Sequence, residues 1–163
     1  NVAERFSGLY WILTLPNADT GSRTIIKKIE DFVHNNSEKS CLFSSLGQLR
    51  YLSLLKNAAL MVGNSSSGLI EAPSFELPVV NIGDRQKGRI KAANIIDVPM
   101  CEPDKIEAAI NKAVSNNFRD SLKGLKNPYG DGNTSDKIVE TLRVVSLSGI
   151  SEKQFYEINV KEC

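Results

Sequence analysis

The sequence predicts an α/β protein built around a Rossmann-like, doubly wound parallel sheet. Short apolar runs of strand length alternate along the chain with segments whose apolar residues recur every three to four positions. Turn-forming Gly, Pro, Asn and Ser residues separate these segments. Such alternation is typical of βαβ units, in which right-handed crossovers place helices on both faces of a mostly parallel sheet.

Strands are expected where apolar or β-branched residues are contiguous and turn residues follow them. The first is an apolar and aromatic run that ends at Pro16 and Asn17. The expected strands cover residues 9–15, 41–44, 58–63, 78–82 and 94–98.

Helices are expected where apolar residues share one face of a 3.6-residue period. Asp19 or Thr20 can cap the first helix, and Pro103 opens the fourth. Pro73 falls within the first two turns of the third, where proline is tolerated. The expected helices cover residues 24–34, 47–56, 68–75, 103–114 and 134–145.

The chain has 163 residues, which is the length of one domain. We expect a folded lobe over residues 1–145 and a polar, weakly patterned tail over residues 146–163. The sequence opens at Asn1 without Met, so we expect a fragment or a processed chain.

Charge and cysteine content exclude several classes of protein. Twenty basic and nineteen acidic residues leave a formal charge of +1, which does not indicate nucleic acid or an anionic membrane as the main partner. The longest apolar run, residues 9–15, is too short for a membrane helix, and no basic segment of signal-peptide type precedes it. Three cysteines without metal-binding spacing indicate a reduced, cytoplasmic location.

The segment from Val62 to Glu71 carries the most informative chemistry. A buried strand is followed by Gly63-Asn64-Ser65-Ser66-Ser67-Gly68 and then by the start of a helix. Free backbone amides at a helix start, together with serine hydroxyls, suit a phosphate or pyrophosphate group. The alternative is a serine-capped helix in an ordinary tight turn.

Two further charged positions fit a nucleoside diphosphate. Glu71 lies about one turn into the expected helix and could accept hydrogen bonds from a ribose diol, or simply favour the first turn as an acid. Arg85 leads a basic loop at the same edge of the sheet, where a guanidinium could bind phosphate; the alternative is a solvated loop. The loop also holds Lys87, Arg89 and Lys91.

The sequence contains no recognisable catalytic set. His34 is the only histidine and is expected near a helix end, where an exposed structural role fits it. No Ser-His-Asp set, metal-ligand cluster, GxxxxGK[ST] loop or pair of acid-base carboxylates is evident. We therefore expect a binding lobe without its own chemistry, and neither a metal nor a cofactor.

Several ordered strings resemble the hydrolysing UDP-N-acetylglucosamine 2-epimerases of sialic-acid and bacterial capsule biosynthesis. The resemblance runs from about residue 9 to 145, and matches most of the C-terminal lobe of these two-lobed GT-B proteins. Non-hydrolysing relatives typically carry Asp-Ser-Gly-Gly where this chain has Asn64-Ser65-Ser66-Ser67-Gly68, which favours the hydrolysing branch. The matching strings are 15–22, 63–68, 71–74, 80–89 and 127–132.

The resemblance implies a reaction and a set of binding residues. UDP is eliminated from UDP-N-acetylglucosamine to leave a 2-acetamidoglucal, and addition of water then gives N-acetylmannosamine. The implied UDP site consists of side chains that hold the diphosphate (Ser65, Ser66 and Arg85), the ribose (Glu71) and the nucleotide pocket (Asn17 and the backbone of Leu46).

The resemblance also implies missing parts. The family's catalytic carboxylates belong to the N-terminal lobe and a functional histidine to the first strand of the C-terminal lobe, and no residue here matches them. We therefore expect this polypeptide alone to be inactive and to require the N-terminal lobe of a homo-oligomeric parent enzyme. The absent strand would be central in a 3-2-1-4-5-6 order, so we expect a gap in the sheet or pairing with a second chain.

Three alternatives remain open at this point. The substrate of the parent enzyme could be a UDP-diacetamido sugar, because the first lobe would select the sugar. A GT-B glycosyltransferase lobe would share the phosphate site and the ribose acid, but would not be expected to carry the strings at 81–89 and 127–132. A non-enzymatic nucleotide-binding module is the third alternative.

Overall fold

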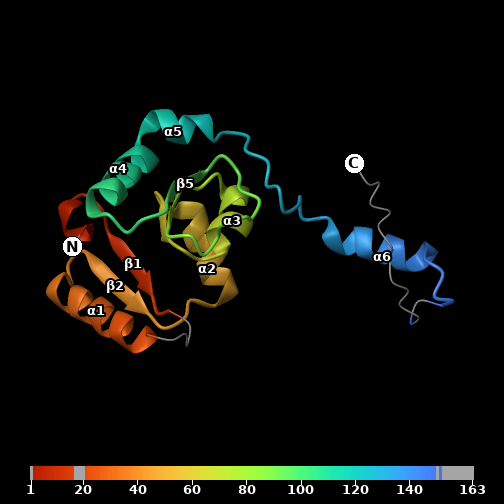
Figure 1. The fold of residues 1–163 in the computed structure, drawn as a ribbon, viewed down its shortest axis with the longest axis horizontal. Coiled ribbons are helices and arrows are strands. Elements are labelled where there is room, and N and C mark those ends of the chain that lie inside the picture. The colour runs from red at the N-terminus through yellow and green to blue at the C-terminus, as the bar shows by residue number, and fades with distance from the viewer. Residues whose placement is uncertain (1, 17–20, 150, 152–163) are drawn as a thin grey trace, which may run out of the picture. The chain divides into compact units, whose positions relative to one another are not determined.

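The computed structural model describes residues 2–16, 21–149 and 151, and its described strands and helices form the predicted α/β, Rossmann-like architecture (Figure 1). The strands are β1 (Trp11–Thr14), β2 (Ser40–Phe43), β3 (Met61–Gly63), β4 (Val79–Ile82) and β5 (Ile95–Val98). The helices are η1 (Ala3–Arg5), α1 (Ser22–Asn35), α2 (Gly47–Asn57), α3 (Ser67–Ile70), η2 (Ala72–Phe75), α4 (Pro103–Val114), α5 (Asn116–Ser121) and α6 (Thr134–Val144).

The described strands form two separate parallel sheets. One has the order β1-β2, with Ile12 opposite Cys41, and the other has the order β3-β4-β5, with Val80 between Val62 and Ile96. No described residue forms a strand between β1 and β3. The prediction that the sheet has a gap is therefore confirmed for the described residues, whereas pairing with a second chain stays a prediction.

Neighbouring residues of a strand point to opposite faces of the sheet. Helices pack against the apolar side chains on both faces of the three-stranded sheet. Val80 packs on the face of α4, whose Ala109, Ile110 and Ala113 are buried. Val79 packs on the opposite face, with Leu55 of α2 and Ala72 of η2. Fully burying one large aliphatic side chain contributes about 1.5–3 kcal/mol, so these two clusters fix the sheet between its helices.

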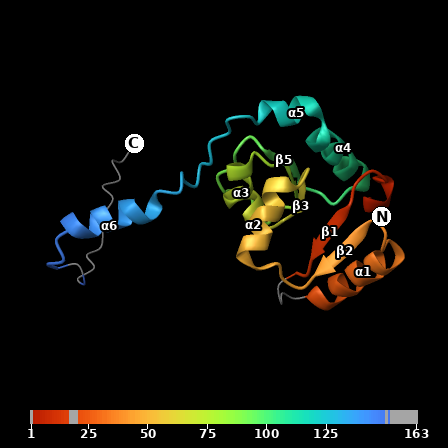
Figure 2. The same ribbon diagram turned by 180° about the vertical axis from the view of Figure 1, so that it is seen from behind.

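Side chains attach the N-terminal segment to the core beneath α4. Phe6, Leu9 and Trp11 pack against the cluster that contains Val80. The rings of Phe6 and Trp11 meet edge to face, with their centroids 6.5 Å apart. Hydrophobic contacts thus join β1 to the core of the larger sheet. Among the described strands, β1-β2 and β3-β4-β5 form separate hydrogen-bonded sheets (Figure 2).

Most predicted elements are present with small shifts at their ends. The helix expected over residues 103–114 has those bounds in the structure. The helix expected over residues 68–75 is wrong in kind: it is divided into the single turn of α3 and the 3-10 turn of η2. Pro73 explains the break because it lacks the amide that would continue an α-helix.

The short helix α5 was not among the expected helices, and some expected caps lie outside the described part. Ser115 caps α5 by accepting a hydrogen bond from the amide of Phe118. Asp19 and Thr20 lie outside the described residues. Gly21 immediately precedes α1 with a φ of 85°, a conformation that glycine adopts at low cost.

Contacts divide the chain into the units Asn1–Tyr129 and Gly130–Cys163. The second unit contains α6, on which Ile138, Leu142 and Val144 are exposed. The predicted boundary at residue 145 stays a prediction. Among the described helices, none is both long and apolar enough to cross a membrane.

Candidate functional site

The candidate site lies where β3 and β4 end. Both strands belong to one parallel sheet, so their carboxyl ends meet at the same edge. The serine-rich turn (residues 63–67) follows β3, and the basic loop (residues 83–91) follows β4.

The serine-rich turn exposes backbone donors. Gly63 has a φ of 152°, which lets the chain turn away from β3. The amide of Gly68 donates to Ser65 O at 3.2 Å, and the amide of Leu69 donates to Ser66 O at 2.9 Å. The backbone amides of Ser65 and Ser66 donate to no group within the described part of the chain. Because α3 is a single turn, these free amides matter more to an anion than a helix dipole does.

Gly68 has a packing role. A Cβ at this position would lie 2.9 Å from Val79 Cγ1, and Gly68 is buried. Its missing side chain lets α3 lie against β4, which holds the serine-rich turn at the edge of the sheet.

Glu71 lies on the same side of the turn as Ser67. Its amide donates to Ser67 O at 2.9 Å. Tyr51 Oη of α2 is 2.6 Å from Ser67 Oγ. Burial raises the pKa of Tyr51, the nearby charge of Glu71 raises it further, and the hydrogen bond with Ser67 opposes both effects. Glu71, Ser67 and Tyr51 therefore form one neighbourhood beside the turn.

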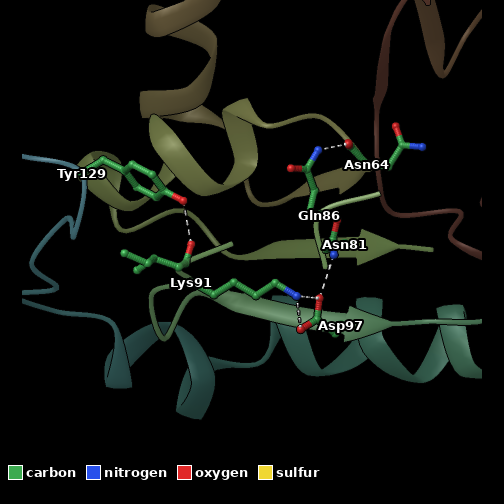
Figure 3. A network of polar contacts seen from close by, with 7 residues as sticks. Asn64, Asn81, Gln86, Lys91, Asp97 and Tyr129 are labelled. Atoms are coloured by element: carbon green, nitrogen blue, oxygen red, sulfur yellow. Dashed lines mark hydrogen bonds and ion pairs between the residues drawn. The ribbon is translucent and has the colours of Figure 1, made fainter. Parts of the chain in front are cut away.

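Gln86 joins the basic loop to the serine-rich turn. Its side chain is 2% exposed, and its Nε2 donates to Asn64 O at 2.7 Å (Figure 3). This hydrogen bond brings together two residues whose chain neighbours are Arg85 and Ser65. Arg85 is exposed and makes no ion pair with another described residue.

Lys91 differs from the other cations of the basic loop because it is already paired. Its Nζ lies 2.8 Å from both carboxylate oxygens of Asp97, and Asn81 Nδ2 donates to Asp97 Oδ1 at 2.7 Å (Figure 3). Burial disfavours the ionised Asp97, but the hydrogen bonds from Lys91 and Asn81 outweigh burial and lower its pKa. Lys91 thus anchors the end of the loop, and Arg85, Lys87 and Arg89 remain available to an anion.

The segment from Asn127 to Tyr129 forms hydrogen bonds with both sides of the site. Asn127 Nδ2 donates to Ile70 O at 2.8 Å and to Ser74 Oγ at 2.7 Å. Tyr129 Oη donates to Ile90 O at 2.9 Å (Figure 3). Residues 127–129, which belong to the string at 127–132, therefore connect the α3–η2 segment with the basic loop, and we call them the strap.

The predicted site also includes Asn17 and the backbone of Leu46. Asn17 lies outside the described residues. Leu46 directly precedes α2 and follows β2, which belongs to the other sheet. No hydrogen bond in the described part of the chain joins Leu46 to the turn or the loop.

Sequence reasoning missed the side chains that position these loops. Gln86 is the only uncharged polar side chain between Asp84 and Lys91, which was a usable signal of a structural role. Tyr51 shares a helix face with Leu55, so its hydroxyl needed a partner at the buried surface. The hydrogen bond from Asn81 to Asp97 depends on the pairing of β4 with β5 and has no comparable sequence signal.

Comparison with known proteins identifies the family. The model of the protein family described as UDP-N-acetylglucosamine 2-epimerase matches residues 1–143. The chain belongs to this family. The Campylobacter jejuni "GDP/UDP-N,N'-diacetylbacillosamine 2-epimerase (hydrolyzing)" is 43% identical to this epimerase-family chain over 148 residues, which cover 90% of this chain and 38% of the relative. The Escherichia coli "Polysialic acid biosynthesis protein P7" is 38% identical over 146 residues, covering 87% and 36%.

Solved structures show the same fold. The Neisseria meningitidis UDP-GlcNAc 2-epimerase bound to UDP-GlcNAc aligns with a TM-score of 0.64 at 22% identity, covering 87% of this chain and 38% of that one. The Methanocaldococcus jannaschii UDP-GlcNAc 2-epimerase with UDP-GlcNAc and UDP aligns with a TM-score of 0.58 at 20% identity, covering 88% and 48%. This epimerase-family chain therefore spans less than half of the length of these relatives.

Proposed function

We propose that this chain binds the uridine diphosphate part of a UDP-2-acetamido sugar for a hydrolysing 2-epimerase. The chain belongs to the 2-epimerase family, and one observation in its structure carries the proposal. The hydrogen bond from Gln86 to Asn64 holds the serine-rich turn, with its free amides, beside the basic loop that carries Arg85. Amides, hydroxyls and a guanidinium at one sheet edge suit a diphosphate.

Each proposed contact follows from the chemistry of its side chain. Ser65 and Ser66 offer hydroxyls and amides to the diphosphate, and Arg85 offers a bidentate guanidinium. Glu71 accepts hydrogen bonds from the ribose diol. Asn17 and the backbone of Leu46 complete the nucleotide pocket. A charged hydrogen bond nets about 1.5–3 kcal/mol, whereas a micromolar complex needs about 8 kcal/mol, so we expect weak binding by this chain alone.

The reaction would use residues that this chain does not supply. Breaking the C1–O bond releases UDP as the proton at C2 leaves, which gives a 2-acetamidoglucal. Water then adds across that double bond to give N-acetylmannosamine. We assign no catalytic residue to this chain, and we expect it to bind UDP without turnover. The parent enzyme would combine it with an N-terminal lobe, as a homo-oligomer in sialic-acid or capsule biosynthesis.

A UDP-diacetamido sugar is the alternative substrate. The Campylobacter relative, at 43% identity, is named for diacetylbacillosamine. Both substrates share the same UDP group, so this chain would bind either of them through the same residues. Incubating the longer parent polypeptide separately with each UDP sugar, and identifying the released sugar by NMR, distinguishes the two substrates.

Calorimetric titration tests the proposed site. UDP is titrated into the chain, with uridine and inorganic phosphate as comparison ligands. We expect UDP to bind more tightly than either comparison ligand. Arg85→Ala should weaken UDP binding about 10- to 100-fold, from the loss of a charge-assisted hydrogen bond, and leave uridine binding unchanged. Glu71→Gln should weaken the binding of both UDP and uridine, because both contain the ribose.

Two control variants test whether a loss of UDP affinity comes from the proposed site or only from the change in the charge of the chain. Arg119→Ala on α5 and Glu30→Gln on α1 change exposed residues of the same types away from this edge. Unaltered UDP binding in Arg85→Ala and Glu71→Gln, or equal losses in the two controls, would show that the site is assigned wrongly.

A further inference from the structure

We propose that Gln86 is a positioning residue that orients the backbone amide of Ser65 toward a bound diphosphate. The inference rests on the proposed function and deepens it. It assigns a role in recognition to a buried side chain that does not itself touch the ligand.

The geometry of one peptide group links Gln86 to the Ser65 amide. Asn64 O and the Ser65 amide belong to the same planar unit, and in a trans peptide the C=O and N–H bonds point in opposite directions. No peptide bond in the described structure is cis. Gln86 Nε2 donates a hydrogen bond to Asn64 O at 2.7 Å (Figure 3). This hydrogen bond therefore also fixes the direction of the Ser65 N–H. That N–H points away from Gln86 and donates to no group in the described part of the chain.

The same hydrogen bond also affects the strength of the Ser65 amide as a hydrogen-bond donor. A donor on the carbonyl oxygen polarises the peptide group and strengthens its N–H as a donor. A peptide held in place also loses less freedom when a ligand binds. Gln86 thus prepares the serine-rich turn for an anion through a contact on the buried side of that turn.

The other end of the Gln86 amide shows that folding alone does not explain the residue. Gln86 Oε1 is buried and has no hydrogen-bond partner among the described residues. An unsatisfied buried acceptor opposes folding, and an apolar side chain of similar length would avoid that cost. The Nε2 donor is therefore the feature of Gln86 that the site uses.

Gln86→Met is the variant that separates the two roles, because methionine has a similar length and no donor. We expect its urea-unfolding midpoint to equal or exceed that of the unmodified chain. We expect its Kd for UDP to rise about tenfold, which corresponds to about 1.4 kcal/mol, and its Kd for uridine to stay unchanged. Calorimetry with UDP and uridine measures both affinities.

Gln86→Glu adds a pH-dependent readout that a purely structural role would not produce. An ionised carboxylate facing Asn64 O repels it, whereas a protonated carboxyl can donate to it in place of the amide. The ratio of the UDP Kd of the variant to that of the unmodified chain should be large at pH 8. It should fall as the pH is lowered to about 5.5, because burial raises the pKa of a carboxyl.

Asn94→Leu provides a matched control at the opposite edge of the sheet. Asn94 is 0% exposed, its Nδ2 donates to Leu77 O at 2.8 Å, and its Oδ1 has no partner among the described residues. It precedes β5, whereas Gln86 follows β4, so its loss should leave the UDP affinity unchanged.

The outcomes distinguish this inference from the proposed function. If the unmodified chain binds UDP and Gln86→Met binds it equally well, the inference is overturned and the proposed function stands. Equal weakening by Gln86→Met and Asn94→Leu also overturns it, because general loss of packing then explains the effect. If the unmodified chain does not bind UDP, the proposed function and the inference both fail.

Discussion

Single side chains decide how firmly the loops of the candidate site are held. Gly68 contributes by having no Cβ, since α3 lies against Val79 of β4. Asp97 contributes by holding Lys91 at the end of the basic loop. Each residue makes a contact that one substitution can remove, so each supports a separate prediction.

Gly68→Ala should destabilise the chain by about 1–3 kcal/mol, because its Cβ would lie 2.9 Å from Val79 Cγ1 in a packed region. Urea unfolding measures the change in free energy. Gly8→Ala is the control, since a Cβ there meets no atom within 4 Å and its change should stay within about 0.5 kcal/mol. Equal unfolding midpoints for the two variants would contradict the packing role of Gly68.

Asp97→Asn should remove a pH-dependent part of stability. The pKa of Asp97 is lowered in the folded state, so its charge stabilises the fold above the unfolded pKa of about 3.9. This contribution is lost as the pH falls through the folded pKa. The variant should therefore be less stable than the unmodified chain at pH 7, and the difference should shrink below about pH 4. Urea unfolding at several pH values tests this, with Asp31→Asn as an exposed control; a difference independent of pH would contradict it.

At the scale of elements, short pieces of secondary structure are held by neighbours far along the chain. The α3–η2 segment is too short to be stable alone. Asn127 anchors it through Ile70 O and Ser74 Oγ, and Tyr129 anchors the basic loop through Ile90 O. The strap thus stabilises two segments that local sequence does not stabilise by itself.

Asn127→Ala should lower the free energy of unfolding by about 1–2 kcal/mol, since three hydrogen bonds are lost at a partly exposed position: two that Asn127 donates and one that it accepts from the amide of Tyr129. Hydrogen exchange should show faster exchange in α3 and η2 than in the unmodified chain. Asn117→Ala on α5 is the control for the loss of an exposed amide. No change in the exchange of residues 67–75 would show that the strap does not hold them.

Sequence periodicity predicted the long elements better than the short ones. The amphipathic pattern of α4 and the apolar run of β4 are strong local signals, and both lie close to the predicted bounds. α5 has only six residues, and its Ser115 cap gives too weak a signal. The division between α3 and η2 was not predicted, because Pro73 was expected to be tolerated within the first two turns of a single helix.

The candidate site was predicted only in part, for a related reason. The serine-rich turn and Arg85 were predicted because loops at the ends of neighbouring parallel strands converge. Gln86 and Tyr51 were missed because each acts through one long-range hydrogen bond, and the sequence does not encode such a pairing locally.

At the scale of the whole molecule, the two sheets leave strand edges unpaired. Alternate amides of a parallel strand point to opposite sides, and the amide of Trp11 donates toward β2 through Lys39 O. The amide of Ile12 therefore points away from β2, toward the side where no described strand pairs with β1. The same reasoning applies to Val62 in β3, because the amide of Met61 donates to Pro78 O beside β4.

The amides of Ile12 and Val62 should exchange with solvent faster than those of Leu13 and Val80. NMR-detected hydrogen exchange on the isolated chain measures this at each residue. The chain spans 38% of the length of its Campylobacter relative. Repeating the measurement on the longer parent polypeptide therefore shows whether its other residues slow the exchange of the Ile12 and Val62 amides. Slow exchange at Ile12 and Val62 in a monomeric sample would contradict two separate sheets.

We propose that a nucleoside diphosphate binds where β3 and β4 end. The most direct test is hydrogen exchange of the chain with and without millimolar UDP, read out along the whole sequence. We expect slower exchange in residues 63–71 and 83–89, with little change in α6. Protection confined to other segments, or none at a UDP concentration that calorimetry shows to be saturating, would contradict it.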